Sequence, residues 1–218
     1  MEPVSEDIQS GYDQVAADYA LAFLDEQDKK PMDREMLHRF ADEVRGKGMV
    51  CDIGCGPGQI AAFLYEHCAL KQVMGLDLSQ RSVEEAQKLH PDMVFRQGNM
   101  LSIVENENAW AGITAFYCLI HIPHSQIVDG LKELKRVLQP GGVLLLTYHI
   151  GNEILHVDTW FDKKVSMDFI LFEPEEMEGY LKSAGFERIL TTVRDPYAPE
   201  IEHQSRRAYV FAYKPFKL

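Results

Sequence analysis

Residues 50–58 read Val50-Cys51-Asp52-Ile53-Gly54-Cys55-Gly56-Pro57-Gly58. A short apolar run passes directly into closely spaced glycines, and a helical pattern that includes Ile60 and Leu64 follows. Because they lack a Cβ atom, Gly54 and Gly56 let the backbone turn sharply and let a ligand approach it closely. The segment therefore predicts a strand, a tight turn and a helix, with a ligand-binding edge at the turn.

An acidic residue supports this interpretation. Asp77 ends the next apolar run, residues 71–77, and Ser79 can cap a helix that runs to about Leu89. A carboxylate at the end of that strand can accept hydrogen bonds from both ribose hydroxyls of an adenosine-containing cofactor. The glycine spacing is GxGxG, whereas nicotinamide-binding proteins have GxGxxG. Together these features favour cofactor binding over the alternative, in which the glycines only make a tight connection.

Strand and helix patterns alternate along the rest of the chain. We expect strands at 48–53, 71–77, 93–97, 111–119, 143–148, 186–194 and 207–214, and a looser stretch at 150–172. Helical patterns cover 6–46, the segments after the first, second and fourth strands, and Pro174 to about Gly185. The alternation predicts right-handed crossovers, and the short, proline-containing link before the last strand predicts an antiparallel pair.

The expected fold is therefore α/β: a Rossmann-like, doubly wound, mainly parallel seven-stranded sheet with an antiparallel last strand and an N-terminal helical cap. We expect residues 1–46 to form the cap and residues 47–218 one compact cofactor-binding domain. A chain of 218 residues and 24.9 kDa has this size.

The composition of the chain reduces the number of partner classes that we expect. The net charge of −12 makes nucleic acid and anionic membranes poor partners, because phosphates are bound by basic surfaces. No run of about 18 apolar residues appears, and the first residues are acidic, so we expect a cytoplasmic protein. The four cysteines lack zinc-like spacing, so we expect structural roles for them and no metal site; they are Cys51, Cys55, Cys68 and Cys118.

The sequence resembles the class I S-adenosylmethionine-dependent methyltransferases of the small-molecule type from about residue 10 to residue 214. The motifs that carry the resemblance are Asp52-Ile53-Gly54-Cys55-Gly56-Pro57-Gly58, Gly75-Leu76-Asp77-Leu78-Ser79, Leu134-Lys135-Arg136-Val137-Leu138-Gln139-Pro140-Gly141-Gly142 and the leading Tyr12-Asp13-Gln14-Val15-Ala16-Ala17-Asp18-Tyr19. The resemblance implies S-adenosyl-L-methionine as cofactor, S-adenosyl-L-homocysteine as product, and an N-terminal helix that closes over the cofactor.

The resemblance also implies a set of cofactor-binding residues. Gly54 and Gly56 would line the methionine part, Asp77 would hold the ribose, and Leu78 would pack against the adenine. Asn99 would lie near the exocyclic amine, although the family often has Asp there, and the alternative for Gly98-Asn99 is a simple turn. The complete predicted set is Tyr12, Tyr19, Asp52, Gly54, Gly56, Asp77, Leu78, Asn99, Met100 and Tyr117.

The acceptor side is less determined. His121 and His149 are candidate bases because histidine titrates near neutrality, although His121 can equally be a structural histidine. Candidate substrate residues are Tyr148, His149, Trp160 and Arg194, the first three as part of an aromatic and histidine-rich wall; the alternative for the 150–172 insert is helix packing. Arg194, His203 and Arg206 can anchor an anionic acceptor, or can pair with Glu200 and Glu202.

Three functions follow for comparison. The leading one is methyl transfer to a small-molecule acceptor, with the acceptor atom undecided. The second is a catalytically silent S-adenosylmethionine-binding partner of another enzyme. The third, NAD-dependent oxidoreduction, fits the α/β pattern but not the glycine spacing. The sequence leaves the oligomeric state open.

Overall fold

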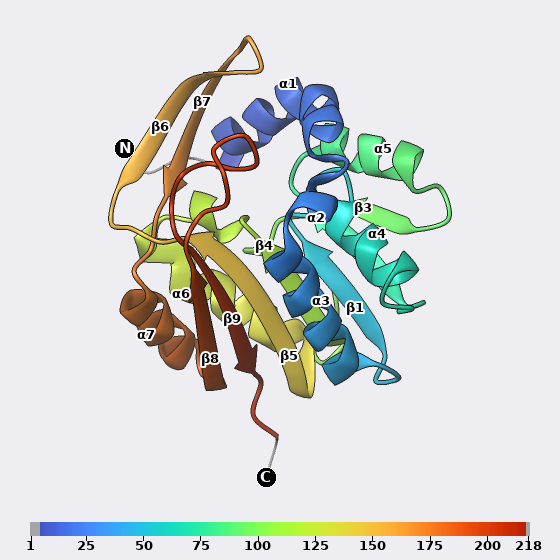
Figure 1. The fold of residues 1–218 in the computed structure, drawn as a ribbon. Helices are drawn as coiled ribbons and strands as arrows, with labels where there is room; N and C mark the ends of the chain where they lie inside the picture. Colours follow the sequence, from blue (N-terminus) through green and yellow to red (C-terminus); the bar gives the residue numbers. More distant parts are fainter. Residues whose placement is uncertain (1–4, 217–218) are drawn as a thin grey trace.

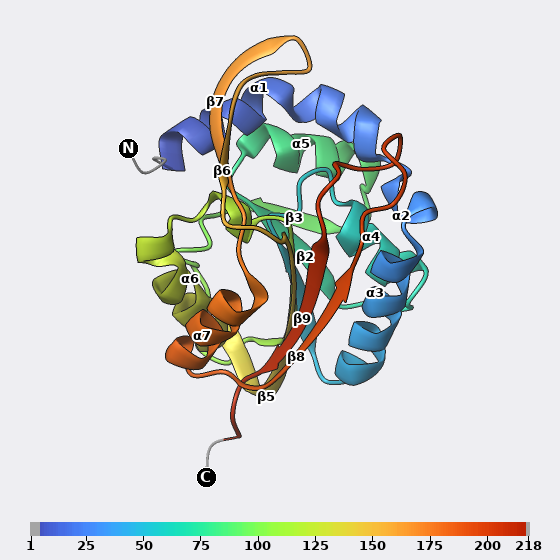
Figure 2. The same ribbon diagram turned by 60° about the vertical axis from the view of Figure 1, so that its left-hand side comes forward.

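The computed structural model describes residues 5–216, which form a seven-stranded sheet with helices on both faces and a separate hairpin (Figures 1 and 2). The helices are α1 (Ser5–Phe23), α2 (Glu26–Lys29), α3 (Pro31–Val44), α4 (Gln59–Glu66), α5 (Gln80–Leu89), the 3₁₀ turn η1 (Leu119–His121), α6 (His124–Val137) and α7 (Pro174–Ala184). The strands are β1 (Met49–Ile53), β2 (Val73–Asp77), β3 (Val94–Gln97), β4 (Trp110–Phe116), β5 (Leu138–His149), β6 (Ile154–Trp160), β7 (Lys163–Ile170), β8 (Glu187–Arg194) and β9 (Arg207–Tyr213).

The strand order of the main sheet is β3-β2-β1-β4-β5-β9-β8. The first five of these strands pair in parallel, and β9 pairs antiparallel with both β5 and β8. The predicted fold class is confirmed, including the antiparallel last strand. The order reverses between β1 and β4, and ligands bind at such a switch point in open α/β sheets.

Two apolar cores cover the two faces of the sheet, because successive side chains of a strand point to opposite sides. In β5, Leu144 and Leu146 belong to the core under α6 and α7, whereas Val143 and Leu145 belong to the core under α3 and α4. Burial on both faces explains the continuously apolar sequence of this strand.

The helical pattern of residues 6–46 is divided into three helices. Lys30 precedes Pro31, and the proline ring disfavours helical dihedrals at the residue before it. Lys30 has φ −119° and ψ 80°, so α2 ends there and α3 begins at Pro31. The division of the chain at residue 46 stays a prediction; α1 crosses above the carboxyl ends of the parallel strands, whereas α3 packs on a face of the sheet (Figure 1).

The stretch 150–172, expected to be loose or to pack as a helix, is an antiparallel hairpin instead. β6 and β7 pair around Phe161 and Asp162, which have φ of 49° and 58°. Two successive residues with positive φ match the turns that suit the twist of a two-residue hairpin. Exposed and half-buried residues alternate from 154 to 158, as expected for a strand with one face turned to solvent.

The hairpin and α1 cover one another at the carboxyl edge of the sheet (Figure 2). Ile8, Val15, Val165 and Met167 form a small separate core between them. Lys163 of β7 forms an ion pair with Asp18 at 2.6 Å and donates to the Gln14 carbonyl at 2.7 Å. The two elements together form the roof of the site described next.

Candidate cofactor and acceptor site

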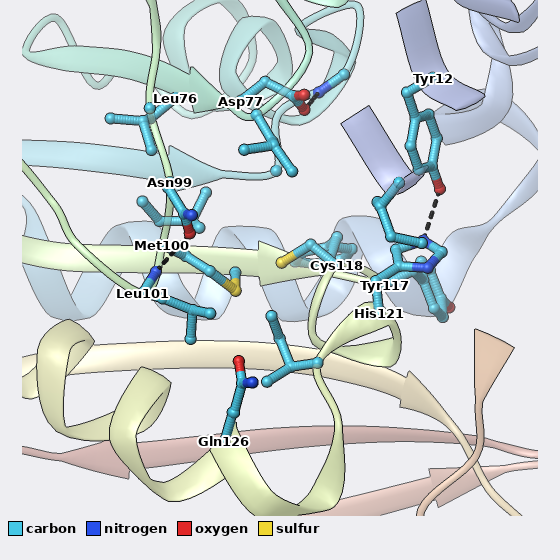
Figure 3. Close-up of a pocket in the computed structure, with 18 of the residues that line it drawn as sticks. Tyr12, Leu76, Asp77, Asn99, Met100, Leu101, Tyr117, Cys118, His121 and Gln126 are labelled. Atoms are coloured by element: carbon cyan, nitrogen blue, oxygen red, sulfur yellow. Dashed lines mark hydrogen bonds between the residues drawn. The ribbon is translucent and has the colours of Figure 1, made fainter. Parts of the chain in front are cut away.

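A cavity of ≈ 130 Å³ lies at the carboxyl ends of β1, β2 and β4, beneath α1. Figure 3 shows side chains around it from α1 (Tyr12), from β2 (Leu76 and Asp77) and from the segment that follows β4 (Tyr117 and Cys118). Its lining includes nine of the ten residues that the sequence predicts for the cofactor, namely Tyr12, Tyr19, Gly54, Gly56, Asp77, Leu78, Asn99, Met100 and Tyr117. The tenth, Asp52, lines a smaller adjoining cavity together with Gly54, Gly56 and Tyr117. We call these two connected spaces the cofactor cavity.

The glycine turn forms the floor of the cofactor cavity. Gly54 has φ +66°, and a Cβ atom there would lie 2.3 Å from Cβ of Cys118. Gly56 has φ +51°, and its Cβ would face the Tyr19 ring at 3.7 Å. The first glycine is therefore required by both conformation and space, and the second keeps the surface open for a ligand.

Asp77 organises this turn. One carboxylate oxygen accepts from the backbone N–H of Gly56 and the other from that of Ser79, both at 2.8 Å. Burial raises the pKa of Asp77 and these hydrogen bonds oppose the rise. Each oxygen retains a lone pair, so the carboxylate can also accept from a ligand's hydroxyls.

Asp52 contains an unpaired buried atom. Its Oδ1 accepts from the Thr114 hydroxyl at 2.7 Å, whereas Oδ2 is buried and has no partner among residues 5–216. Burial raises the pKa of Asp52 to about 7, the Thr114 hydrogen bond lowers it, and the nearby charge of Asp77 raises it. A cationic ligand group beside Oδ2 would supply the missing partner.

Asn99 adopts the turn that was the alternative reading of this position. Its Oδ1 accepts from the backbone N–H of Leu101 at 2.9 Å, while the residue still lines the cavity. The turn and a contact with a ligand are compatible, because an amide oxygen has two lone pairs.

His121 connects the helix α1 to the loop after β4. Its Nδ1 lies 2.8 Å from the Asp168 carbonyl oxygen, which can only accept, so Nδ1 carries the hydrogen. Its Nε2 therefore accepts from the Tyr12 hydroxyl, also at 2.8 Å (Figure 3). Burial lowers the pKa of His121 to about 4 despite the opposing Asp168 contacts, so the imidazole is neutral at pH 7.

A second cavity of ≈ 290 Å³ adjoins the first, and we call it the acceptor cavity. Tyr12, Tyr19 and Tyr117 line both spaces and form the wall between them. The hairpin contributes Trp160 and Phe169, whose rings are 5.8 Å apart and perpendicular. Aromatic and aliphatic side chains thus form most of this cavity.

The candidate substrate residues separate into two groups. His149 and Trp160 line the acceptor cavity, as does His203. Tyr148 is fully buried against Phe172 in the core below α7 and lines neither space, because its side chain points to the opposite face of β5 from His149. The structure does not bring Tyr148 to either cavity, and its role as a substrate residue stays a prediction.

Arg194 also lies outside both cavities. Its guanidinium binds both carboxylate oxygens of Glu202 and donates to the Tyr209 hydroxyl at 2.8 Å. Arg194 therefore makes the ion pair with Glu202 that was the alternative, and its direct contact with a substrate stays a prediction that neither cavity supports. Arg206 is exposed, with its closest acid, Asp195, at 3.7 Å.

Several lining residues were missed. Cys118 and Gln126 face the cofactor cavity (Figure 3), and Lys30, Phe23 and Arg207 line the acceptor cavity. Gln126 follows the loop after the fourth strand, where a ligand-facing side chain is expected in this kind of sheet. No motif in the sequence around Lys30 or Arg207 indicates a binding role, because the two residues come to the site from opposite ends of the sequence.

Comparisons with known proteins agree with this geometry. Residues 50–142 match the model of a methyltransferase domain. Over this segment the chain is similar to the S-adenosylmethionine-dependent methyltransferases. The cofactor of this methyltransferase family is S-adenosylmethionine, and the matched segment contains the glycine turn, Asp77 and Asn99.

Three relatives illustrate the similarity. A malonyl-[acyl-carrier protein] O-methyltransferase of Enterobacter lignolyticus is 25% identical over 75% of this chain and 67% of its own length. A ubiquinone/menaquinone biosynthesis C-methyltransferase of Desulfotalea psychrophila is 34% identical over 44% of this chain and 39% of its own length. The DhpI–SAH complex superposes with a TM-score of 0.74 at 19% identity, covering 98% of both chains.

These identities and coverages limit what can be inferred for this chain from its relatives. The chain matches about two thirds of the first relative's length and well under half of the second's. The solved structure establishes the fold of the methyltransferase and nothing about its acceptor. Within residues 5–216, no helix has the length and apolar character to cross a membrane.

Proposed function

We propose that this methyltransferase transfers a methyl group from S-adenosylmethionine to a small organic acceptor. The observation that carries the proposal is the pair of adjoining cavities with a shared wall of Tyr12, Tyr19 and Tyr117. One cavity has the cofactor motifs and the other has an aromatic lining. The shared tyrosines place the two cavities side by side, and direct group transfer then requires that their side chains leave an opening through which the two ligands touch.

The residues of the cofactor cavity fit S-adenosylmethionine. Oδ2 of Asp52, buried and unpaired, suits the cofactor's ammonium group, and the Asp77 carboxylate suits the ribose hydroxyls. Leu78, Met100 and Asn99 line the part of the cavity that suits the adenine. When bound, S-adenosylmethionine supplies an electrophilic methyl group on a positively charged sulfur.

The chain's own residues align the acceptor and exclude water. The faces of tyrosine rings attract cations, and the three shared tyrosines can stabilise positive charge at the boundary between the cavities. α1 and the hairpin close the site from above, which keeps the reacting groups dry. Alignment and desolvation are therefore the main contributions that we propose.

The candidate bases are suited to holding the acceptor rather than to removing a proton. A general base works best with a pKa near the operating pH. Burial lowers the pKa of His121 to about 4, and burial together with the neighbouring cations Arg207 and Lys30 lowers that of His149 to about 3. Both are too weakly basic for an alcohol or an ammonium group, so we propose positioning roles for them.

We also propose a cytoplasmic protein that acts on small molecules and does not bind nucleic acid. The net charge of −12 disfavours a phosphate backbone, and the four cysteines are free. A filter-binding assay with tRNA and duplex DNA at low salt tests the first point, and cell fractionation tests the second.

The central experiment is calorimetric titration with S-adenosylmethionine, S-adenosylhomocysteine and NAD. Asp77→Asn removes the charge but retains an acceptor for the turn, and Asp129→Asn, on the exposed side of α6, is the matched control. We expect micromolar binding of both adenosyl compounds, a loss of about tenfold or more in Asp77→Asn, and no change in the control. Transfer of labelled methyl groups to small molecules of a cell extract would then identify an acceptor.

The alternatives give different results. Adenosyl binding without transfer to any extract component would indicate a silent cofactor-binding partner. Binding of NAD in place of the adenosyl compounds would indicate an oxidoreductase. A folded protein that binds none of the three would contradict the proposal.

A further inference from the structure

The acceptor cavity has one polar end, which contains Lys30, His149 and Arg207 together with Glu26 and Glu202. The Lys30 and Arg207 side chains are 5% and 2% exposed, so both cations are almost completely withdrawn from water. Lys30 Nζ and the Arg207 guanidinium carbon each lie 5.6 Å from the centre of the Tyr117 ring. Two buried positive groups thus lie close to the wall between the cavities.

The two carboxylates at this end are already bound by the protein. Glu26 accepts from Lys30, and Oε2 of Glu202 lies 3.8 Å from Nζ of Lys30 and 3.6 Å from the Arg207 guanidinium. Glu202 accepts from Arg194 through both oxygens, and its Oε1 also accepts from the backbone N–H of Tyr197 at 2.7 Å. Burial acts to raise the pKa of Glu202, but these hydrogen bonds and the neighbouring arginines together outweigh burial and lower the pKa to about 2. Neither acid is left as a ready partner for a cationic ligand.

His149 adds a neutral donor. The Ser205 hydroxyl oxygen accepts from the Arg207 guanidinium and lies 2.8 Å from Nδ1 of His149. We assign the hydroxyl hydrogen to this second contact, so that Nδ1 accepts and Nε2 carries the ring hydrogen. No acceptor for Nε2 occurs in the part of the chain that the structure describes.

Tyr117 also has a polar group without a hydrogen-bond partner. Its hydroxyl is buried and has no partner among the described residues, although the residue lines both cavities. Its backbone has φ +53°, a conformation that few non-glycine residues adopt. Strain at a site residue with an unpaired hydroxyl fits a position held for a ligand. Nε of Arg207 is also buried without a partner among the described residues, so the unused hydrogen-bonding groups at this end include the Arg207 and His149 donors and a Tyr117 hydroxyl that can donate.

We infer that the methyl acceptor is an organic carboxylate, whose anionic group binds at the polar end through Lys30, Arg207 and His149. Its apolar part then lies against Trp160 and Phe169, which line the same cavity. Oxygen anions satisfy several donors at once, and buried cations bind them more strongly than exposed ones do. This inference rests on the proposed function, because it assumes that the acceptor lies beside the cofactor.

The test measures binding to protein saturated with S-adenosylhomocysteine. Three acids and their neutral amides serve as probes: benzoate and benzamide, 3-phenylpropanoate and 3-phenylpropanamide, hexanoate and hexanamide. Hexylamine represents the opposite charge. Saturation-transfer NMR and calorimetry give the dissociation constants. We expect the best acid to bind about tenfold more tightly than its amide, equivalent to about 1.4 kcal/mol.

Substitutions at the polar end test whether the acids bind there. Lys30→Met and His149→Phe should remove the preference for the acid, and His149→Phe keeps the test informative if Lys30→Met fails to fold. Lys29→Met is the matched control for Lys30, since Lys29 is exposed and pairs only with Asp25 among the described ion pairs. Arg206→Gln is a second control, one residue from Arg207 but exposed.

The outcomes distinguish the two proposals. If the wild-type protein does not bind S-adenosylhomocysteine, the proposed function itself is contradicted. If cofactor binding is intact, three results would overturn the carboxylate inference alone. They are equal affinity for acids and amides, tighter binding of hexylamine than of the acids, and no binding of any acid. An acid preference that persists in both site variants would overturn it as well.

Discussion

The Tyr12 hydroxyl lies 2.8 Å from Nε2 of His121, and this hydrogen bond joins the first helix to the loop that follows β4. The two residues are 109 positions apart. Because Asp168 fixes the other ring nitrogen from β7, one imidazole holds α1, η1 and the hairpin together above the cofactor cavity. Closure of the site therefore depends on a small set of contacts that reach across the whole chain.

Tyr12→Phe should weaken cofactor binding without unfolding the protein. The variant keeps the ring that lines both cavities but leaves Nε2 of His121 buried without a donor, which costs about 1–3 kcal/mol. We expect S-adenosylhomocysteine to bind roughly tenfold more weakly by calorimetry. Tyr65→Phe on α4, whose hydroxyl makes no contact in the site, is the control. Unchanged affinity in Tyr12→Phe would show that the hydrogen bond does not stabilise the closed site.

Asp52 should make the stability of the ligand-free protein depend on pH. Its pKa rises from 3.8 in the unfolded chain to about 7 in the fold, so the folded state binds a proton more tightly. The stabilisation is complete below pH 3.8 and is lost as the pH rises to about 7. At 1.4 kcal/mol per unit, the loss is on the order of 4 kcal/mol.

Asp52→Asn keeps an oxygen for Thr114 and removes this titration. Denaturant unfolding between pH 4 and pH 8, buffered at constant ionic strength, should therefore show a flatter profile for the variant than for the wild type. Asp77 also has a raised pKa and contributes in both proteins, so the difference between the profiles reports Asp52 together with its coupling to Asp77. Parallel profiles would contradict the assignment.

Two glycines should respond in opposite directions to alanine. A Cβ at Gly54 would lie 2.3 Å from Cys118 with φ +66°, so Gly54→Ala should destabilise the fold by more than 1 kcal/mol and abolish S-adenosylhomocysteine binding. Gly179 lies inside α7 with nothing within 4 Å of its Cβ position, so Gly179→Ala should stabilise by about 0.5–1 kcal/mol. Urea unfolding of both variants checks the pair.

Trp160→Ala should separate acceptor binding from cofactor binding. Trp160 lines the acceptor cavity and lies edge-on to Tyr12 and Tyr19, at 5.9 and 5.4 Å between ring centres. We expect a rise of about tenfold in KM for the acceptor, once one is identified, and little change in S-adenosylhomocysteine affinity. Val104→Ala, at an exposed position away from both cavities, is the control. Equal losses of both affinities would show that Trp160 supports the roof as a whole.

The sequence by itself determined the sheet and one side of the site. Local signals sufficed there: apolar runs marked the strands, and Gly54, Gly56 and Asp77 stand at strand ends that a parallel sheet must bring to one edge. All ten residues predicted for the cofactor line the cofactor cavity, although their contacts with the cofactor stay a prediction.

Only the tertiary structure decided the acceptor side. Lys30, Tyr117, His149 and Arg207 come from four distant segments, and no periodicity or motif relates them. Tyr148 and His149 are neighbours in sequence, yet the alternation of side chains along β5 sends one into the core and the other into the cavity. Arg194 and Arg207 face one another across the β8–β9 register, yet only Arg207 reaches the cavity. Which buried donors reach the cavity depends on packing between distant elements, and that packing is not encoded in any single stretch of sequence.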